Sequence, residues 1–264
     1  MYPRISVVVP SLNQGQFLEN ALRSIVGQHY ANLELIVIDG GSQDSSLDII
    51  KKYSGDIDYW VSEPDGGQTN GLIKGFNRAT GDIQTWLNAD DMHEPHTLKT
   101  VADFFQHHPA ARFVYGNCLW IDEYGRILQY RREMDFYKWL WLYAYNYIPQ
   151  PAAFWKRTLY YQVGGLNADF LLSMDRDIFA RFARICHMHH IDAPLARFRF
   201  HRIQRSRLFR KLCNKEEHAV LCREVGRQVG PVERFIVGKM ARAIRYSYRH
   251  AFLRASLDGF VNGK

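Results

Sequence analysis

Strand-like and helix-like segments alternate through the first half of this chain, and that alternation limits the folds open to it. An apolar β-branched run occurs at residues 5–9, and further strand-like runs follow at residues 33–38, 57–61, 83–87 and 112–115. Between them, apolar side chains recur at helical spacing at residues 14–26, 42–53, 71–79 and 95–105. The alternation predicts an α/β fold with a mainly parallel, doubly wound sheet.

The rest of the chain is less regular. Residues 119–129 resemble a β-hairpin with its turn at 123–126, and residues 175–185 resemble a helix. From about Gln204 onward the pattern predicts two amphipathic helices that break near Gly230-Pro231. We therefore expect an α/β domain over residues 1–204 and a basic helical extension over residues 205–264.

Charge separates these two parts. Residues 197–264 carry 17 Lys+Arg against 5 Asp+Glu, a net charge of +12, whereas residues 1–196 carry 17 against 22, a net charge of −5. The basic tail could contact an anionic membrane, a phosphate-bearing acceptor or nucleic acid, or it could be a solvated face with no partner. Its last helix, at residues 231–255, gathers apolar side chains near one face, as helices on anionic lipid do; packing on the first domain is the alternative.

Several features indicate the compartment. The chain opens on Met1-Tyr2-Pro3-Arg4 without a secretory signal, and no apolar run approaches the ~20 residues of a membrane span. The four cysteines form no CxxC pair. We expect a cytoplasmic protein, or one that lies peripherally on the inner face of the plasma membrane. Aromatic residues make up 14% of the chain, which favours a well-filled core over stacking surfaces.

Polar, glycine-rich or acidic segments follow the predicted strands. In doubly wound sheets, ligands bind beyond the carboxyl ends of the strands, where these segments would meet. They are residues 10–13, 39–44, 62–68 and 88–91. This clustering predicts a ligand site at one edge of the sheet.

Two adjacent carboxylates, Asp90 and Asp91, end the strand at 83–87. Neighbouring carboxylates repel unless a cation or solvent relieves them, and Mg²⁺ or Mn²⁺ suits such oxygen ligands. As an alternative, Asp91 could cap the helix that we expect to begin at Pro95. The residues alone leave both open.

Two other strand ends carry weaker signals. Asp39 precedes two glycines that would let a ligand approach the backbone, although a plain strand-to-helix turn has the same pattern. Lys74 shares a helical face with Asn70 and Asn77 and could contact a phosphate, or the face could simply be exposed.

Together these motifs resemble family 2 glycosyltransferases, which have the GT-A fold. Four segments occur in the family's order, and the resemblance covers about residues 4–205, closest to bacterial members that build cell-surface polysaccharide. The segments are Val-Val-Val-Pro-Ser-Leu-Asn at 7–13, Asp-Gly-Gly-Ser-Gln-Asp at 39–44, Ser-Glu-Pro-Asp at 62–65 and Asn-Ala-Asp-Asp at 88–91.

The resemblance implies a nucleotide site and a metal. Asp39 would read the base, most often uracil, and Asp90 would be the main ligand of Mn²⁺ or Mg²⁺, with Asp91 and His201 as further candidates. An isolated histidine such as His201 is as often structural. The other residues implied around the nucleotide are Pro10, Ser11, Leu12, Asn13, Asp65, Gly67, Gln68, Lys74, Asn88 and Ala89. Asn88 departs from the family pattern, because an acid usually stands there.

The resemblance also implies a catalytic base and an acceptor side. Asp175 stands where the family has its general base, with Met174 in place of the usual acid; from the residues alone, Asp175 could equally cap a helix. The acceptor side would be shaped by Gln150, Trp155, Gly165 and Asp177.

The expected function is transfer of a sugar, with inversion, from a nucleotide sugar to a hydroxyl of a glycan or a polyprenyl-diphosphate-linked acceptor. A sugar nucleotidyltransferase would need a basic, glycine-rich loop after the first strand, and a dehydrogenase would need GxGxxG there; residues 10–15 have neither. A nucleic-acid-binding module would use the basic tail, but it leaves the strand-end carboxylates unexplained because they repel phosphates. Nucleic acid is therefore not an expected partner.

Overall fold

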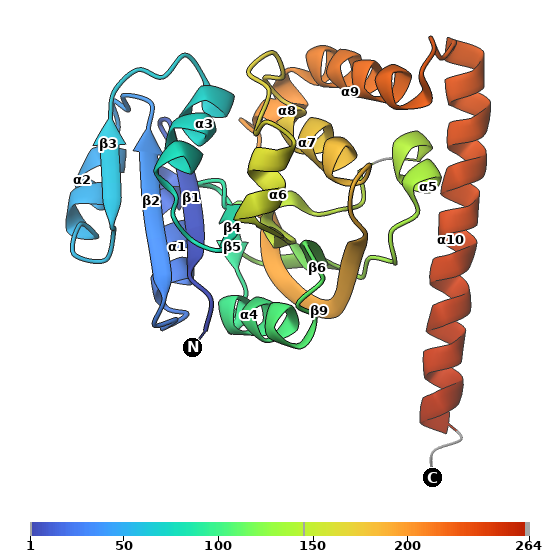
Figure 1. The fold of residues 1–264 in the computed structure, drawn as a ribbon, viewed down its shortest axis with the longest axis horizontal. Helices are drawn as coiled ribbons and strands as arrows, with labels where there is room; N and C mark the ends of the chain where they lie inside the picture. Colours follow the sequence, from blue (N-terminus) through green and yellow to red (C-terminus); the bar gives the residue numbers. More distant parts are fainter. Residues whose placement is uncertain (1, 145, 262–264) are drawn as a thin grey trace.

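A nine-stranded mixed sheet forms the centre of the molecule (Figure 1). The computed structural model describes residues 2–144 and 146–261, with side chains through Ser247. The strand order is β3-β2-β1-β4-β8-β6-β9-β5, and β7 pairs with β6. The strands are β1 (Ile5–Ser11), β2 (Leu33–Asp39), β3 (Tyr59–Ser62), β4 (Ile83–Trp86), β5 (Met92–His93), β6 (Phe113–Ile121), β7 (Ile127–Arg131), β8 (Ala153–Lys156) and β9 (Met188–Arg199).

Helices cover both faces of the sheet, as the alternating pattern predicts. Those of the first half are α1 (Gly15–Val26), α2 (Ser46–Lys52), α3 (Gln68–Arg78) and α4 (Thr97–His107). The later ones are α5 (Lys138–Tyr143), the 3₁₀ turn η1 (Gln150–Ala152), α6 (Arg157–Gln162), α7 (Met174–Phe182), α8 (Arg205–Leu208), α9 (Arg210–Val225) and α10 (Pro231–Val261). The α/β prediction is confirmed.

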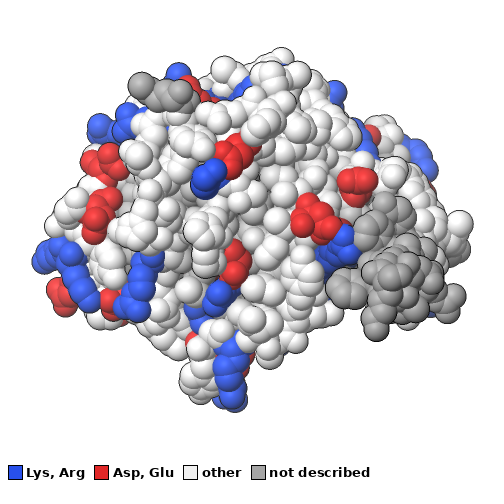
Figure 2. Space-filling model, turned by 90° about the horizontal axis from the view of Figure 1, so that it is seen from below, with Lys and Arg blue, Asp and Glu red and all other residues white. Residues whose placement is uncertain are grey.

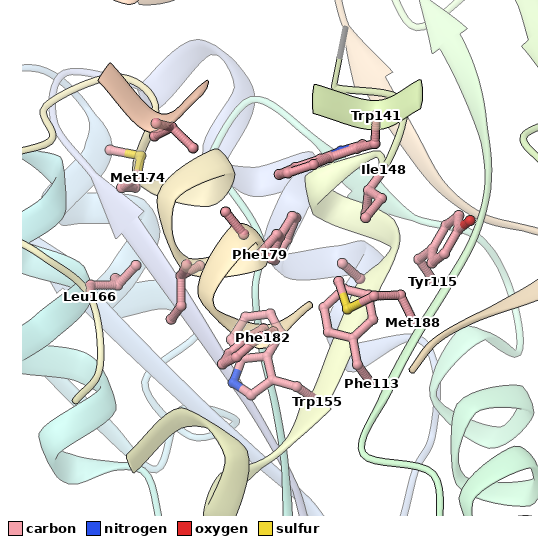
Figure 3. Packing of buried hydrophobic residues seen from close by; sticks show 14 of the residues in the cluster. Phe113, Tyr115, Trp141, Ile148, Trp155, Leu166, Met174, Phe179, Phe182 and Met188 are labelled. Carbon is pink, nitrogen blue, oxygen red and sulfur yellow. The ribbon is translucent and has the colours of Figure 1, made fainter. Parts of the chain in front are cut away.

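Two apolar clusters, one on each face, hold the sheet between its helices. Alternate residues of β1 enter different clusters: Val8 joins Phe76 of α3 and Trp155 of β8, whereas Val7 joins Leu18 of α1. Figure 3 shows part of the first cluster, with Trp155 lying beside Phe182. The abundant aromatic residues of the chain therefore serve mainly as core.

The second half of the sheet is less regular than the sequence indicates. β8 is antiparallel to both β4 and β6, so the sheet is parallel only in part. The 12-residue strand β9 carries two histidines and no long apolar run, which is why its pattern predicts no strand. Helix α4 begins at Thr97 rather than at Pro95, because His96 has a left-handed backbone. The hairpin predicted at residues 119–129 is confirmed as β6 and β7.

The basic C-terminal segment forms helices on one side of the sheet (Figure 1). Helix α9 packs on α7, and α10 packs on α5. None of the helices among the described residues has the length and apolar character needed to cross a membrane. The division at residue 204 into a domain and an extension stays a prediction.

Candidate active site

The carboxyl ends of four parallel strands bring the predicted ligand segments to one edge of the sheet. Ser11, at the end of β1, lies opposite Asp39 of β2, and Asp39 lies opposite Ser62 of β3. The backbone N–H of Leu87 donates to the carbonyl of Val8 at 3.0 Å, so the segment after β4 begins beside β1. Residues 10–13, 39–44, 62–68 and 88–91 therefore share this edge.

Asp39 organises the loop that follows β2. Its Oδ2 accepts hydrogen bonds from the backbone N–H groups of Gly41 (3.2 Å) and Ser42 (2.8 Å) and from the Ser62 hydroxyl (2.6 Å), while its Oδ1 accepts from the Ser42 hydroxyl (2.5 Å). A carboxylate has about four acceptor sites, two on each oxygen, so Oδ1 keeps room for a further donor. The side chain is fully buried beneath the loop, and its contact with a base stays a prediction.

The loops after β1 and β2 are joined by Asn13. Its backbone, at φ 51°, has a left-handed conformation that asparagine tolerates. Its N–H donates to the Ser42 hydroxyl at 2.7 Å, and its Oδ1 accepts the N–H of Gln43 at 2.9 Å. Leu12 beside it is exposed, whereas Pro10 and Ser11 are buried. Asn13 thus holds in place the two loops that the resemblance assigns to the nucleoside.

The loop before α3 lies against the same structure. Asp65 accepts the N–H of Gly67 at 2.8 Å. Its carboxylate lies beside Gly40 and Gly71, where an added Cβ would come within 3.3 Å and 2.6 Å of it. Glycine at these two positions therefore lets the loop carrying Asp65 approach the loop after Asp39.

Asn88 is a hydrogen-bonding hub where β4 ends. Its Oδ1 accepts from Nε2 of Gln68 at 2.8 Å, and its Nδ2 donates to Gln150 Oε1 (3.2 Å) and Asp91 Oδ2 (3.3 Å). Gln150 in turn donates to the Trp86 carbonyl at 2.7 Å. A carboxylate at position 88 would repel Asp91, so these contacts explain the asparagine that departs from the family pattern. The adjacent Ala89 is buried in the core.

Asp91 is buried and engaged with β9. Its Oδ1 accepts the backbone N–H of Arg199 at 3.0 Å, and its Oδ2 accepts from Asn88. Burial, and next the negative charge of Asp90, raise the pKa of Asp91 well above its usual range. These contacts give Asp91 a structural part and make it a poor candidate for a metal ligand. The helix that it was expected to cap begins instead after His96.

Asp90 and His201 face each other across the end of the sheet. Nε2 of His201 lies 2.9 Å from Oδ2 of Asp90, and the imidazole packs on Phe17 with ring centroids 4.8 Å apart. Nδ1 of His201 is buried and has no hydrogen-bond partner among the described residues. Arg199 fixes the same turn by donating to the Asp90 carbonyl at 2.8 Å. The pair offers one carboxylate and one imidazole, both of which suit a divalent ion.

Asp175 occupies the first turn of α7, whose N-cap is Ser173. Its Oδ2 accepts a hydrogen bond from Nδ2 of Asn146 at 2.8 Å, and Asn146 Oδ1 accepts from the Trp141 indole at 2.8 Å. Burial is the main reason that the pKa of Asp175 is raised to about 6, and the negative charge of Glu217 adds to it. A carboxylate with such a pKa is a stronger base than usual and is still ionised near neutral pH.

A single loop connects the surroundings of Asp90 and Asp175. Asn146 contacts Asp175, and Gln150, four residues later, contacts Asn88 beside Asp90. A second link runs from the Thr69 hydroxyl, at the start of α3, to the Phe170 carbonyl at 2.6 Å. The two links tie the donor-side loops to the loop that precedes Asp175. Asn146 carries no sequence signal, because an isolated asparagine in an aromatic stretch predicts no role.

Two residues expected on the acceptor side lie in the interior instead. The Trp155 side chain is fully buried, packed against Phe182 and Trp86. Asp177 is also fully buried and forms ion pairs with Arg181 and Arg223. Neither side chain presents a surface to an acceptor, so both expectations are corrected.

Two further residues have structural contacts. Gly165 has φ 71°, and its carbonyl accepts from Arg181 at 2.6 Å, so it forms a turn before α7. Lys74 forms an ion pair with Glu63 at 2.7 Å. Its contact with a phosphate stays a prediction, and it would require Lys74 to leave Glu63.

Comparison of the sequence with protein families agrees with this geometry. The model described as glycosyl transferase family 2 matches residues 6–171, which is more than half of the chain. The chain belongs to glycosyl transferase family 2. The matched range includes the strand-end loops and Asn146 but stops before Asp175 and His201.

Relatives with curated descriptions support the same family membership. Over 198 residues the chain is 27% identical to the uncharacterized glycosyltransferase Rv1514c of Mycobacterium tuberculosis, covering 74% of this chain and 75% of the relative. Over 183 residues it is 30% identical to a PGL/p-HBAD biosynthesis glycosyltransferase of Mycobacterium bovis, covering 68% and 69%. These matches cover about two thirds to three quarters of the chain, so the similarity to glycosyltransferases extends well beyond the strand-end motifs.

Solved structures share the fold. Residues 1–349 of TarS of S. aureus, in complex with UDP-GlcNAc, match with a TM-score of 0.66 at 14% identity over 89% of this chain and 70% of that one. The mannosyltransferase PcManGT of Pyrobaculum calidifontis, in complex with GDP-Man and Mn²⁺, matches with a TM-score of 0.65 at 19% identity over 98% and 81%. The GT-A fold expected for this family 2 glycosyltransferase is thus confirmed.

Proposed function

We propose that this glycosyltransferase moves a sugar, with inversion, from a UDP-sugar to a hydroxyl of a glycan or lipid-linked acceptor in surface polysaccharide biosynthesis. The observation that carries the proposal is the arrangement of Asp90 with His201 on one side of the loop at residues 146–150 and Asp175 on the other. Solved neighbours hold UDP-GlcNAc or GDP-Man, and we infer a UDP-sugar from the resemblance at Asp39.

The donor side would hold Mn²⁺ or Mg²⁺ through Asp90 and His201. Among the described residues no group of three or more His, Cys, Asp or Glu side chains is poised to hold a metal, so the donor diphosphate and water would complete the coordination. Bound there, the ion would offset the negative charge that develops on the departing diphosphate. Burial is the main cause of the raised pKa of Asp91, and the negative charge of Asp90 adds to it; a cation bound at Asp90 would offset this second contribution.

The acceptor side would deprotonate the incoming hydroxyl. Asp175 is a half-buried carboxylate with a pKa near 6, and Asn146 fixes one of its two oxygens. A base positioned opposite the leaving group favours direct displacement and hence inversion at the sugar carbon. General-base assistance of this kind contributes roughly 10²–10⁴-fold to the rate.

The acceptor class rests on relatives and on charge. Curated relatives include glycosyltransferases named for PGL/p-HBAD biosynthesis. We infer for this chain a glycan or polyprenyl-diphosphate-linked acceptor, reached on the inner face of the plasma membrane through the basic residues 205–264.

A donor screen tests the proposal. We expect one nucleotide sugar, a UDP-sugar, to raise the melting temperature in the presence of Mn²⁺, and the enzyme to hydrolyse that sugar slowly without acceptor. EDTA should remove both effects. Binding of nucleic acid but of no nucleotide sugar would instead support a nucleic-acid-binding module that uses the basic tail. Binding of a nucleoside triphosphate together with a sugar phosphate would support a sugar nucleotidyltransferase.

A further inference from the structure

A short basic and apolar surface follows directly after His201. We call it the rim segment, residues 202–211; it includes the four-residue helix α8 and the start of α9. Its apolar side chains Ile203, Leu208 and Phe209 are 57%, 59% and 53% exposed, so they lie on the surface and outside the core. Its exposed cations are Arg202, Arg205, Arg207, Arg210 and Lys211.

The positive charge of the rim segment is not balanced within the described part of the chain. The sequence contains no Asp or Glu between Asp192 and Glu216. Among the described residues, none of the five cations forms an ion pair, whereas Arg223 and Arg227, farther along α9 and after it, pair with Asp177 and Glu233. The segment therefore presents uncompensated charge next to exposed apolar surface.

The chain on both sides of the rim segment is attached to the candidate active site. On the donor side, His201 faces Asp90 and Gln204 donates to the Arg199 carbonyl at 3.2 Å. On the acceptor side, Glu216 of α9 accepts the backbone N–H of Ser173 at 2.8 Å, two residues before Asp175. Glu216 also accepts the N–H groups of the two leucines that precede Ser173. The segment thus runs along the rim between the two halves of the site.

The opposite end of the molecule differs in character. Figure 1 draws the arrowheads of β2 and β3 toward the end where α8 lies, so the rim segment is at the carboxyl edge of the parallel strands. Figure 2 views the other end, where acidic and basic side chains are interspersed. The exposed cations of the rim segment would attract an anionic surface to the edge that carries the site.

We propose that the rim segment docks on an anionic lipid bilayer and so turns the active site toward the membrane. A free polyanion would need only the cations, whereas the three exposed apolar side chains among them fit the boundary between headgroups and acyl chains. Helix α10 also exposes apolar side chains, among them Val232, Ile236 and Met240, together with the cations Lys239 and Arg242. It packs on α5, however, whereas the rim segment follows directly after His201. This docking role rests on the proposed function, because a lipid-linked acceptor would be reached at the membrane.

Flotation with vesicles tests the docking surface directly. Wild-type protein should bind phosphatidylcholine vesicles that contain phosphatidylglycerol and should not bind pure phosphatidylcholine. Arg205→Glu/Arg210→Glu should lower the partition coefficient at least about tenfold, because each basic residue near an anionic surface contributes to binding. Lys51→Glu/Arg157→Glu, an equal change of charge at exposed positions on α2 and α6, should leave it unchanged. Equal binding by the two double variants, or no wild-type binding, overturns the proposal.

A second pair of variants separates lipid from phosphate and the rim from α10. Leu208→Ser/Phe209→Ser should also weaken vesicle binding severalfold, since these side chains would enter the lipid boundary. Wild-type-like vesicle binding by this variant would show that the segment binds phosphate groups alone. Loss of binding in Ile236→Ser/Met240→Ser, with retention in Arg205→Glu/Arg210→Glu, would assign the membrane to α10. Flotation requires no turnover, so it tests membrane docking independently of the proposed function. Mn²⁺-dependent UDP binding by the same variants shows whether they are folded and tests the proposed donor site.

Discussion

Nδ2 of Asn146 donates a hydrogen bond of 2.8 Å to Oδ2 of Asp175, so this amide holds one of the two oxygens of the proposed base. The oxygen that Asn146 leaves free is Oδ1. Because the Trp141 indole holds Oδ1 of Asn146, the amide cannot turn to present its acceptor to the carboxylate without losing that bond. Trp141 and Asn146 are thus positioning residues for Asp175.

The first prediction concerns the pH profile. The amide of Asn146 stabilises the ionised form of Asp175, so Asn146→Ala should raise the pKa of that carboxylate further above 6. The base must be ionised, and the acidic limb of kcat should therefore move about one pH unit toward higher pH. Trp141→Phe, which removes the indole N–H together with part of the buried ring, leaves Asn146 in place and should give a smaller movement in the same direction. A lower kcat with an unmoved acidic limb would mean that Asn146 acts only through the fold.

The second prediction concerns turnover. Asp175→Asn keeps the shape of the side chain and removes the base, so kcat should fall by roughly 10²–10⁴ while the affinity for UDP-sugar stays near wild type. Steady-state kinetics and calorimetric donor titration measure the two quantities. Asp169→Asn, an exposed acid in the turn before α7, is the matched control and should be active. Normal turnover by Asp175→Asn would remove this residue from the mechanism.

The third prediction concerns stability. Folding raises the pKa of Asp175 from 3.8 to about 6, so the folded state binds the proton more tightly than the unfolded state. The free energy of unfolding therefore falls as pH rises from about 4 to 6, because Asp175 must ionise in its buried site. Above that range the loss amounts to about 3 kcal/mol. Asp175→Asn should raise the melting temperature at pH 8, and much less at pH 4. Equal effects at both values would contradict a raised pKa.

Much of the first half of the fold follows from periodicity and strand-end chemistry. The runs that form β1 and β2 are mostly apolar and rich in β-branched residues, and the register of β1, β2 and β3 aligns Ser11, Asp39 and Ser62 at the predicted edge. The segment at 88–91 was likewise expected to end a strand. Local sequence is sufficient here because β1, β2 and β4 are buried on both faces; β3, at the edge of the sheet, is half-buried.

The rest depends on contacts between distant residues, which no local pattern contains. The contact of His201 with Asp90 joins residues 111 apart, and the bond from Asn146 to Asp175 crosses 29 residues. The acidic neighbour of Asp91 suggested a metal ligand, but Oδ1 of Asp91 accepts a hydrogen bond from the backbone N–H of Arg199 in β9. β9 itself went unpredicted, so that contact could not be foreseen.

The fourth prediction separates Asp90 from Asp91. Asp90→Ala should remove the Mn²⁺-dependent part of UDP affinity, and His201→Ala should weaken it at least about tenfold, since a lost ligand cannot be replaced by an aliphatic side chain. Asp91→Asn should retain the Mn²⁺ dependence, because its carboxyl is engaged with Arg199 and Asn88. Calorimetric titration of UDP with Mn²⁺ and with EDTA measures all three. Unchanged Mn²⁺ dependence in Asp90→Ala would move the metal elsewhere.

The fifth prediction tests the corrected role of Asp177. This buried carboxylate pairs with Arg181 on its own helix and with Arg223 of α9, so it joins α7 to the C-terminal helices. Asp177→Ala leaves the largely buried Arg181 without its carboxylate, while Arg223 keeps its ion pair with Glu224, and should cost about 3 kcal/mol of unfolding free energy, measured by urea denaturation. Removing both cations as well, in Asp177→Ala/Arg181→Met/Arg223→Met, should restore part of that loss. At a temperature where Asp177→Ala remains folded, its KM for the acceptor should be near wild type; a large rise in KM without loss of stability would return Asp177 to the acceptor side.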